Sequence, residues 1–126
     1  MPGPEPAPQI PTDITLDRKA RVLALTYAEP GGERRYDLSF EFLSVHSPSA
    51  EVRGHGRGQE TLQVGKRGVD IVALEPVGMY ALQPTFSDGH NSGIFAWPYL
   101  RELCEQHDAL WRDYLARLEQ AGASRD

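Results

Sequence analysis

The chain has 126 residues, of which 40% are hydrophobic and 25% are charged, proportions that are typical of one soluble globular domain. Its 18 acidic and 13 basic residues give a net charge of −5, which argues against a nucleic-acid-binding protein, because phosphate contacts need clustered lysine and arginine. The single cysteine excludes an internal disulfide and a cysteine-rich zinc module.

Residues 1–12 form an N-terminal tail that is rich in proline. Proline fixes φ and lacks a backbone donor, so we expect this tail to be disordered. The tail has neither the basic start nor the apolar centre of a signal peptide, and no run of about 20 apolar residues follows it. The sequence therefore predicts a cytoplasmic protein that does not engage a membrane.

Strand signals open the single domain that we expect over residues 13–121. An apolar stretch at Ile14–Leu16 is followed by Val22–Tyr27, in which side chains alternate between two faces as they do in a strand. The alternation returns in Glu33–Leu38, after the turn signal Pro30-Gly31-Gly32. The pattern predicts a β-hairpin.

A short helix and a glycine-rich loop come next. Ser39 is a candidate N-cap for a helix over Phe40–Val45, which ends before Pro48 because the residue before a proline disfavours the α region. The stretch 54–68 contains five glycines and predicts a loop with a short strand, Thr61–Val64. This loop lacks the GxxxxGK[ST] pattern of a phosphate-binding loop.

Two further strands are predicted in the segments "VDIVALEPV" and "MYALQPTF", which a turn at 76–78 separates. Pro84 lacks a backbone donor, so the second of these strands should lie near an edge or a bulge at this point. A last strand, Gly93–Ala96, follows the turn sequence "SDGHNSG".

A long amphipathic helix is predicted over Pro98–Gln120, where apolar residues recur with helical spacing. Gly122 ends it, and residues 122–126 should form a frayed tail. Such a helix overhangs a small sheet, so we expect its end around Trp111–Leu118 to be exposed and available to a partner. The elements together predict an α+β fold, a mostly antiparallel sheet with a short inserted helix and a long C-terminal helix packed on one face.

The apolar positions of these elements predict the hydrophobic core. Cys104 lies on the apolar stripe of the long helix and should be an inert buried thiol. The expected core residues are Leu23, Leu25, Phe40, Leu43, Ile71, Ala73, Leu82, Phe86, Phe95, Trp97, Leu100, Leu103 and Trp111.

Residues that catalyse reactions or bind metals do not form a recognised pattern here. The chain has no G-x-S-x-G elbow, and none of its histidines belongs to an H-E-x-x-H or H-x-D motif. His107 is best explained as a helix-face residue. His46, His55 and His90 lie in predicted loops and could converge on a metal, although their spacing does not require it. We therefore expect a protein that is not an enzyme.

The segments "SPSAEVRGHG" and "EPVGMYALQPTFSDGH" closely resemble the gamma-butyrobetaine hydroxylase-like N-terminal domain family. The resemblance covers about residues 14–105. In this family the domain precedes the catalytic jelly roll of gamma-butyrobetaine and trimethyllysine dioxygenases, is appended to P-loop iron–sulfur carriers, or stands alone in bacteria as a domain of unknown function. The resemblance implies an accessory domain, and we expect this chain to lack the catalytic domain with its iron, 2-oxoglutarate and substrate sites.

The resemblance also implies a zinc corner that this chain has lost. In the dioxygenases, three cysteines in a C-P-C-x-x-C run bind zinc together with a histidine after a D-G-H turn. The cysteine positions fall on Ser47, Ser49 and Val52, and only His90 retains its ligand type. Serine and valine do not replace thiolates as zinc ligands, so we expect no bound metal and no cofactor. In this reading His90 is structural and hydrogen-bonds to the loop of Ser47 and Ser49.

The leading hypothesis is a small non-catalytic binding or adaptor domain with a protein partner of unknown identity. Its expected binding edge contains His46, Ser47, Ser49, Arg53, His55 and His90. The alternative is an accessory protein that handles a metal or an iron–sulfur cluster, as the family's fusions suggest. A third possibility is a small enzyme, or one half of an oxygenase. The oligomeric state stays open.

Overall fold

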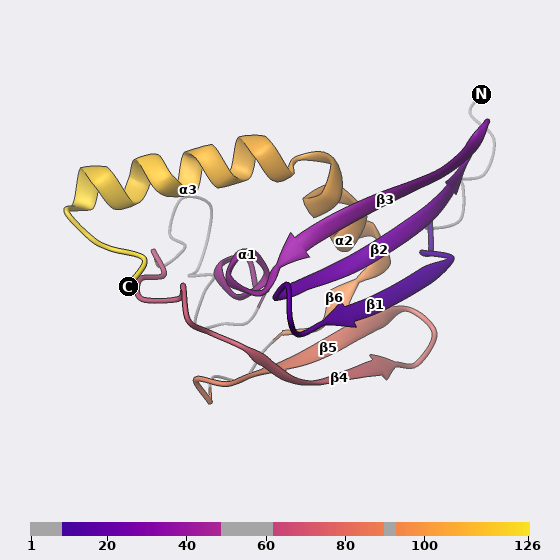
Figure 1. Ribbon diagram of the computed structural model, residues 1–126, viewed down its shortest axis with the longest axis horizontal. Coiled ribbons are helices and arrows are strands. Elements are labelled where there is room, and N and C mark those ends of the chain that lie inside the picture. The colour runs from indigo at the N-terminus through magenta and orange to yellow at the C-terminus, as the bar shows by residue number, and fades with distance from the viewer. Residues whose placement is uncertain (1–8, 49–61, 90–92) are drawn as a thin grey trace, which may run out of the picture.

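The computed structural model describes residues 9–48, 62–89 and 93–126. In this part of the chain, six strands form two antiparallel three-stranded sheets, and three helices pack against them (Figure 1). The predicted α+β class is confirmed, although the strands divide into two small sheets. None of the helices in these three segments is long and apolar enough to cross a membrane.

The first sheet contains β1 (Asp13–Asp17), β2 (Val22–Glu29) and β3 (Gly32–Ser39), in that order. β2 and β3 pair antiparallel along their full length, which confirms the predicted hairpin. The turn between them contains Gly31 at a φ of +88°, a backbone conformation that glycine adopts without steric cost.

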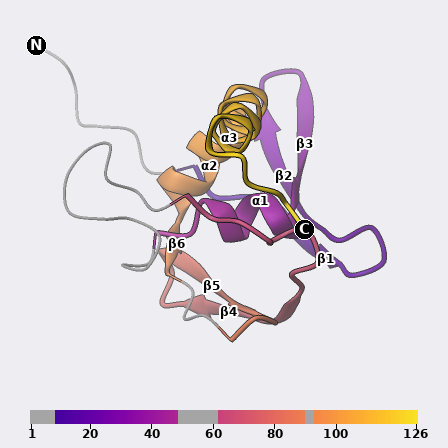
Figure 2. The ribbon, with the colours of Figure 1, turned by 90° about the vertical axis from the view of Figure 1, so that its left-hand side faces the viewer.

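α1 (Phe40–Val45) begins immediately after β3 and has the predicted bounds. The Ser39 hydroxyl caps the helix by accepting a hydrogen bond from the backbone N–H of Phe42 at 3.0 Å. All the residues of α1 are buried, because the helix lies between the two sheets and the C-terminal helices (Figure 2). This central position explains why its polar residues Glu41 and Ser44 are buried as well.

The second sheet contains β4 (Ile71–Val77), β5 (Ala81–Phe86) and the short β6 (Phe95–Ala96), in that order. Both strands predicted from the segments around the turn at 76–78 are present. The pairing of β4 with β5 shifts register between Ile71 and Ala73, as a β-bulge does.

The strand predicted at Thr61–Val64 is not present: Thr61 lies outside the described residues, and residues 62–64 have no strand partner. α3 (His107–Ala121) holds this segment instead. The Tyr114 hydroxyl donates a hydrogen bond to the Gln63 carbonyl at 2.7 Å, and Leu62 packs beside the same tyrosine. This segment therefore contacts α3, and it does not pair with a strand.

The single helix predicted over 98–120 is two helices, α2 (Trp97–Glu105) and α3. They join at Gln106, whose φ of −101° and ψ of 9° interrupt the helical backbone. α2 packs against β6 and β3, whereas α3 continues over α1 (Figure 1). A straight helix could not follow both surfaces. The apolar stripe alone did not reveal the break, because its helical spacing continues on both sides of Gln106.

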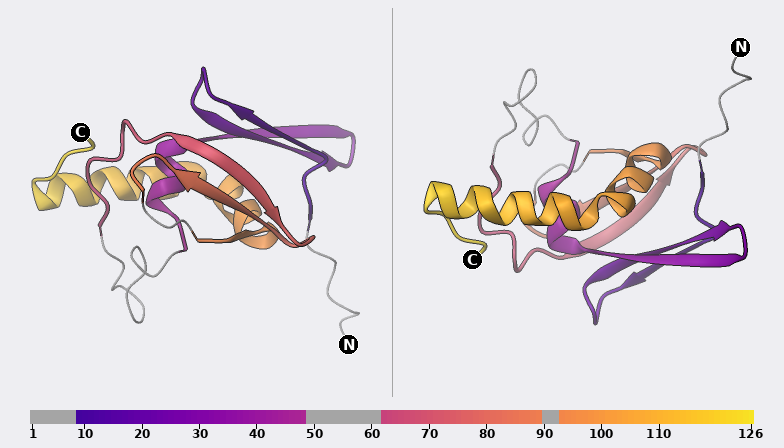
Figure 3. Two further views of the ribbon diagram at one scale, coloured as in Figure 1. Left: turned by 90° about the horizontal axis from the view of Figure 1, so that it is seen from below. Right: turned by 90° about the horizontal axis from the view of Figure 1, so that it is seen from above.

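The expected exposure of Trp111–Leu118 is wrong at its central positions. α3 does run past the end of the first sheet (Figure 3), but Tyr114 and Leu118 are 3% and 4% exposed and pack with Val45 of α1. Of this stretch, Leu115 is the large apolar residue that lies at the surface, beside the exposed Ala116. The reason is that α1 and the segment around Leu62 cover the overhang.

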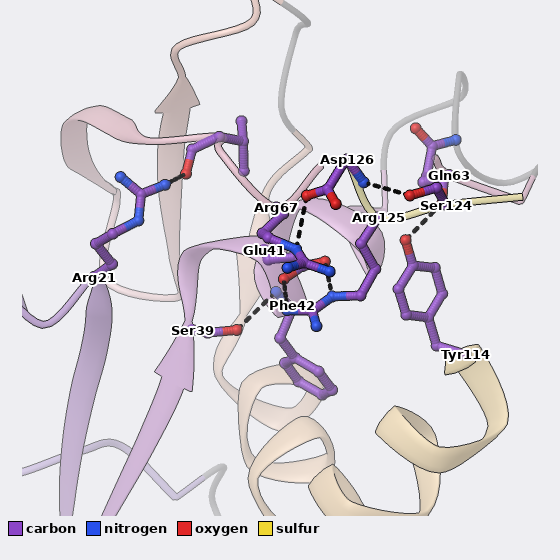
Figure 4. A network of polar contacts seen from close by, with 11 residues as sticks. Arg21, Ser39, Glu41, Phe42, Gln63, Arg67, Tyr114, Ser124, Arg125 and Asp126 are labelled. Carbon is purple, nitrogen blue, oxygen red and sulfur yellow. Dashed lines mark hydrogen bonds and ion pairs between the residues drawn. The ribbon is translucent and has the colours of Figure 1, made fainter. Parts of the chain in front are cut away.

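The C-terminal residues, for which the sequence predicts a frayed tail, are held against α1 and the segment at 65–67 (Figure 4). The Gly65 N–H donates to the Ser124 carbonyl at 3.0 Å, and the Arg67 N–H donates to the Arg125 carbonyl at 2.9 Å. The Arg125 guanidinium binds both carboxylate oxygens of Glu41, at 2.7 and 2.9 Å. Because the buried carboxylate of Glu41 would be costly without a cation, this ion pair stabilises the docked position of the C-terminal residues.

The predicted core is confirmed at every position except Ala73 and Trp111, which are half-buried. Ala73 follows the register shift in β4, where the inward and outward alternation changes. Trp111 lies between the main core and the smaller cluster around Tyr114. The structure adds further buried hydrophobic residues that the sequence analysis did not include: Ala24, Tyr27, Leu38, Phe42, Val45, Val69, Ala81, Tyr114 and Leu118.

Candidate binding site

Two of the predicted binding residues, His46 and Ser47, lie in the described part of the chain. The others, Ser49, Arg53, His55 and His90, lie outside it. His46 and Ser47 are adjacent at the end of α1, where the chain leaves the core.

Ser47 is fully buried, and its hydroxyl accepts a hydrogen bond from the Gly93 backbone N–H at 3.0 Å. This bond joins the end of α1 to the segment just before β6. It crosses the corner at which the resemblance places the zinc site. A neutral hydroxyl already engaged by a backbone N–H is a poor zinc ligand, and no three His, Cys, Asp or Glu side chains converge within residues 9–48, 62–89 and 93–126. The other positions of that corner, Ser49, Val52 and His90, lie outside the described residues.

The imidazole of His46 packs between aromatic and charged neighbours. Its centroid lies 4.7 Å from that of Phe42, and the Phe42 centroid lies 4.6 Å from that of His107. Nε2 of His46 is buried and has no hydrogen-bond partner. Burial, with a smaller contribution from Arg117, lowers the pKa of His46 to about 4, so the ring is neutral near pH 7.

A pocket of about 540 Å³ opens beside His46, between the end of α1, the segment at 62–63, α2 and α3. We call it the α1–α3 pocket. Its walls are partly aliphatic and aromatic and partly polar. The lining residues are Val45, His46, Ser47, Leu62, Gln63, Tyr99, Glu102, Leu103, Gln106, Leu110, Asp113, Tyr114 and Arg117.

Two tyrosines of the pocket have their hydroxyls engaged by backbone carbonyls. The Tyr99 hydroxyl donates to the His46 carbonyl at 2.6 Å, and the Tyr114 hydroxyl donates to the Gln63 carbonyl at 2.7 Å (Figure 4 shows the second). Burial also raises the pKa of Tyr114. The rings are therefore rigid contact surfaces, and their hydroxyls are unsuited to proton transfer.

The charged groups of the pocket lie on α2 and α3. Arg117 forms an ion pair with Asp113 at 3.0 Å, one helical turn away. Glu102 is exposed and belongs to no ion pair within the described segments. The paired charges neutralise each other, so the rim carries an excess of negative charge at Glu102.

The remaining candidate groups for catalysis are inert or serve packing. Cys104 is buried as predicted, and burial raises the pKa of its thiol to about 11, which keeps it protonated. His107 begins α3, as a helix-face histidine would, and its Nδ1 lies 2.9 Å from the Asp108 carboxylate. The sequence analysis missed the contribution of Tyr99, which the apolar stripe of the helix does not mark.

Comparisons with known proteins agree with this architecture. The family described as gamma-butyrobetaine hydroxylase-like, N-terminal, matches residues 14–101. An NMR solution structure is similar with a TM-score of 0.81 and 52% identity, covering 95% of this chain and 92% of that one. A second NMR structure has a TM-score of 0.76 and 42% identity, covering 99% of this chain and 90% of the other.

A crystal structure from Acidithiobacillus ferrooxidans ATCC 23270, of a DUF971-family protein with unknown function, has a TM-score of 0.59 and 40% identity. The similarity covers 74% of this chain and 90% of that protein. No curated protein matches the chain.

Proposed function

This chain belongs to the gamma-butyrobetaine hydroxylase-like N-terminal family, and we propose that it is a non-catalytic binding domain whose α1–α3 pocket holds a segment of a partner protein. The observation that carries the proposal is the pocket itself. Its lining combines four aliphatic side chains and two tyrosine rings with charged and amide groups, so it offers a ligand both apolar contacts and polar partners.

The chemistry of the lining supports binding over catalysis. The hydroxyls of Tyr99 and Tyr114 are engaged by backbone carbonyls, and burial lowers the pKa of His46 to about 4. A general acid or base works best with a free proton-transfer site and a pKa near the working pH, and none of these three groups combines the two. Rigid aromatic surfaces held by hydrogen bonds are instead suited to an anchor side chain.

The proposed occupant is a segment with an apolar anchor residue beside a lysine or arginine. Leu62, Leu110 and the tyrosine rings offer the apolar contacts, and Glu102 offers a carboxylate at the rim. The net charge of −5 on the whole chain favours the approach of a basic partner.

A random-peptide display selection against the whole protein tests this proposal. We expect the enriched peptides to share an apolar residue next to a basic one. Glu102→Arg should weaken the binding of these synthesised peptides by about tenfold or more, equivalent to about 1.4 kcal/mol. The matched control is Glu119→Arg, which makes the same charge change at an exposed position of α3 outside the pocket.

Leu110→Ala provides a second measurement, because it removes an apolar contact without changing charge. It should weaken the same peptides while circular dichroism shows an intact fold. Selected peptides that bind all these variants and the parent protein equally well would mean that the α1–α3 pocket is not the binding site.

A further inference from the structure

β3 is an edge strand. The order of the first sheet is β1-β2-β3, so β2 pairs with one side of β3, and no strand among the described residues pairs with the other side. β3 is the strand of this sheet that lies nearest to α2 and α3 (Figures 1 and 2). An unpaired strand edge presents backbone N–H and C=O groups to any extended chain that approaches it.

A groove of about 780 Å³ runs along this edge, which we call the β3 groove. One wall contains the consecutive residues 34–38 of β3, and the other contains residues from the end of α2 and the start of α3. Side chains of a strand alternate between its two faces. Five consecutive residues line one groove only if the groove follows the strand edge itself, so its floor includes backbone groups of β3.

Three of the four carboxylates that line the β3 groove lie within ion-pair distance of an arginine. Arg101 binds Glu29 at 2.8 Å and Glu105 at 3.1 Å, and Arg35 binds Asp37 at 2.8 Å. The fourth carboxylate, from Asp108, lies 2.9 Å from the Nδ1 atom of His107. The groove thus contains four arginines and four carboxylates, so it carries no net negative charge that would repel an acidic ligand.

Two arginines of the groove belong to no ion pair within the described residues. Arg34 on β3 and Arg112 on α3 are exposed, and neither forms an ion pair with another described residue. The guanidinium of Arg34 lies 4.9 Å from the centre of the Tyr36 ring, and that of Arg101 lies 5.2 Å from it. In addition, Nη1 of Arg101 is buried without a hydrogen-bond partner. One free guanidinium on each wall favours a ligand with carboxylates on both sides.

The second sheet shows a contrasting edge. The Arg18 guanidinium donates to the Val72 carbonyl at 3.0 Å, and the Arg21 guanidinium donates to the Val69 carbonyl. Pro76 removes a further donor from β4. These features hinder pairing along β4, whereas no described side chain hydrogen-bonds to the backbone of residues 32–38.

We propose that the β3 groove binds an extended acidic segment of a partner protein, which adds as a further strand to the outer edge of β3. Backbone hydrogen bonds to β3 supply the register, and carboxylates on alternate residues reach Arg34 on one side and Arg112 on the other. The surface is separate from the α1–α3 pocket, although Gln106 at the junction of α2 and α3 contributes to both. The inference does not depend on the proposed occupant of that pocket.

A second copy of this chain is a less suitable occupant. Its β3 carries Glu33 and Asp37 beside Arg34 and Arg35, so it brings no net negative charge to the free guanidinium groups of the groove.

The experiment uses a capped peptide of alternating threonine and glutamate, about as long as β3, and the whole protein. We expect amide chemical shifts of residues 33–38 to move on titration, and their hydrogen exchange to slow, because strand addition protects outward N–H groups. A peptide with lysine in place of glutamate should bind at least tenfold more weakly.

Charge reversals test the two walls of the groove. Arg34→Glu and Arg112→Glu should each weaken the glutamate peptide by about tenfold, whereas the matched control Lys19→Glu, in the exposed turn before β2, should leave its affinity unchanged. A glutamate peptide that is N-methylated at alternate residues keeps its charges but lacks half of its donors, and it should lose the protection of β3.

Three results would overturn the proposal. Equal affinity for the glutamate and lysine peptides would show that the arginines do not select an acidic ligand. Equal binding and protection by the N-methylated peptide would exclude strand addition. A dimer that protects β3 in sedimentation and exchange experiments, together with no peptide binding, would assign the edge to a second copy.

Discussion

The imidazole of His46 shows how packing changes the chemistry of a single residue. His46 is the C-cap residue of α1, and its ring packs against Phe42. The titratable and charged groups near it are Asp113, Arg117 and His107. Asp113 raises the pKa of His46, but burial, Arg117 and His107 outweigh it and lower the value to about 4. A residue that would titrate near pH 6.5 in an unfolded chain is therefore neutral throughout the neutral and mildly acidic range.

The free energy of unfolding should consequently decrease as the pH is lowered through a window set by His46. Below about pH 6.5 the unfolded chain binds a proton on this ring, while the folded protein does so only near pH 4. The stability contribution is fully present above pH 6.5 and is lost as the pH falls toward 4. The loss amounts to roughly 3 kcal/mol over the window.

Urea unfolding of the parent protein and of His46→Gln measures this effect. Carboxylates titrate in the same range, so the informative quantity is the difference between the two proteins at each pH. The difference should change by roughly 3 kcal/mol in the stated direction. A difference in the free energy of unfolding that stays constant from pH 7 to pH 4 would show that the His46 ring is not shielded from water.

At the scale of elements, the C-terminal segment after α3 closes over the centre of the fold. Gly122, at a φ of +64°, ends α3 and turns the chain back toward α1. The guanidinium of Arg125 then binds Glu41 and lies 5.2 Å from the centre of the Trp111 ring (Figure 4 shows the ion pair). One side chain therefore connects the tail, the central helix and the long helix.

Replacing Arg125 by alanine should destabilise the protein by about 2 kcal/mol. The change leaves the carboxylate of Glu41, which is 6% exposed, without its cation. Because the Arg125 side chain itself is 32% exposed, water moderates the loss below that of a fully buried pair.

Urea unfolding checks this prediction, with Arg112→Ala as the matched control, since that arginine is exposed and has no ion pair among the described residues. The control should stay within about 0.5 kcal/mol of the parent. The double variant Glu41→Gln with Arg125→Ala should recover part of the loss, because no buried charge then remains unpaired. An Arg125→Ala protein as stable as the parent would contradict the role of the tail.

For the whole molecule, the question is what joins the end of α1 to the chain before β6. In the described residues, the bond from the Gly93 N–H to the Ser47 hydroxyl makes this connection. The family resemblance places a zinc ion at the same corner, but a buried serine hydroxyl is not the thiolate that such a site requires. The fold should therefore depend on this hydrogen bond and on its core.

Paired thermal melts test the point. EDTA should leave the midpoint of unfolding unchanged, because no metal-binding free energy is coupled to folding. Ser47→Ala should lower the midpoint, since it leaves the partly buried Gly93 N–H without its acceptor at a cost of about 1 kcal/mol. A drop of several degrees on chelation, with metal found by elemental analysis, would instead favour the metal-handling alternative.

The local elements could be predicted from the sequence because their signals are short-range. Ser39 and Pro48 bracket α1, and the glycines after Pro30 mark the hairpin turn, so these bounds follow from neighbouring residues. The candidate site was predicted in part: His46 and Ser47 were named, but the pocket that they line was not. Tyr99 and Tyr114 reach that pocket from helices far along the chain.

Periodicity determined that the helical region is amphipathic and that the fold class is α+β, because burial repeats with the pitch of each element. Only the tertiary structure decided the break at Gln106, the division into two sheets and the pairing of Glu41 with Arg125. Those two side chains are 84 positions apart. A contact over that separation depends on how whole elements pack, and no local pattern of residues encodes it.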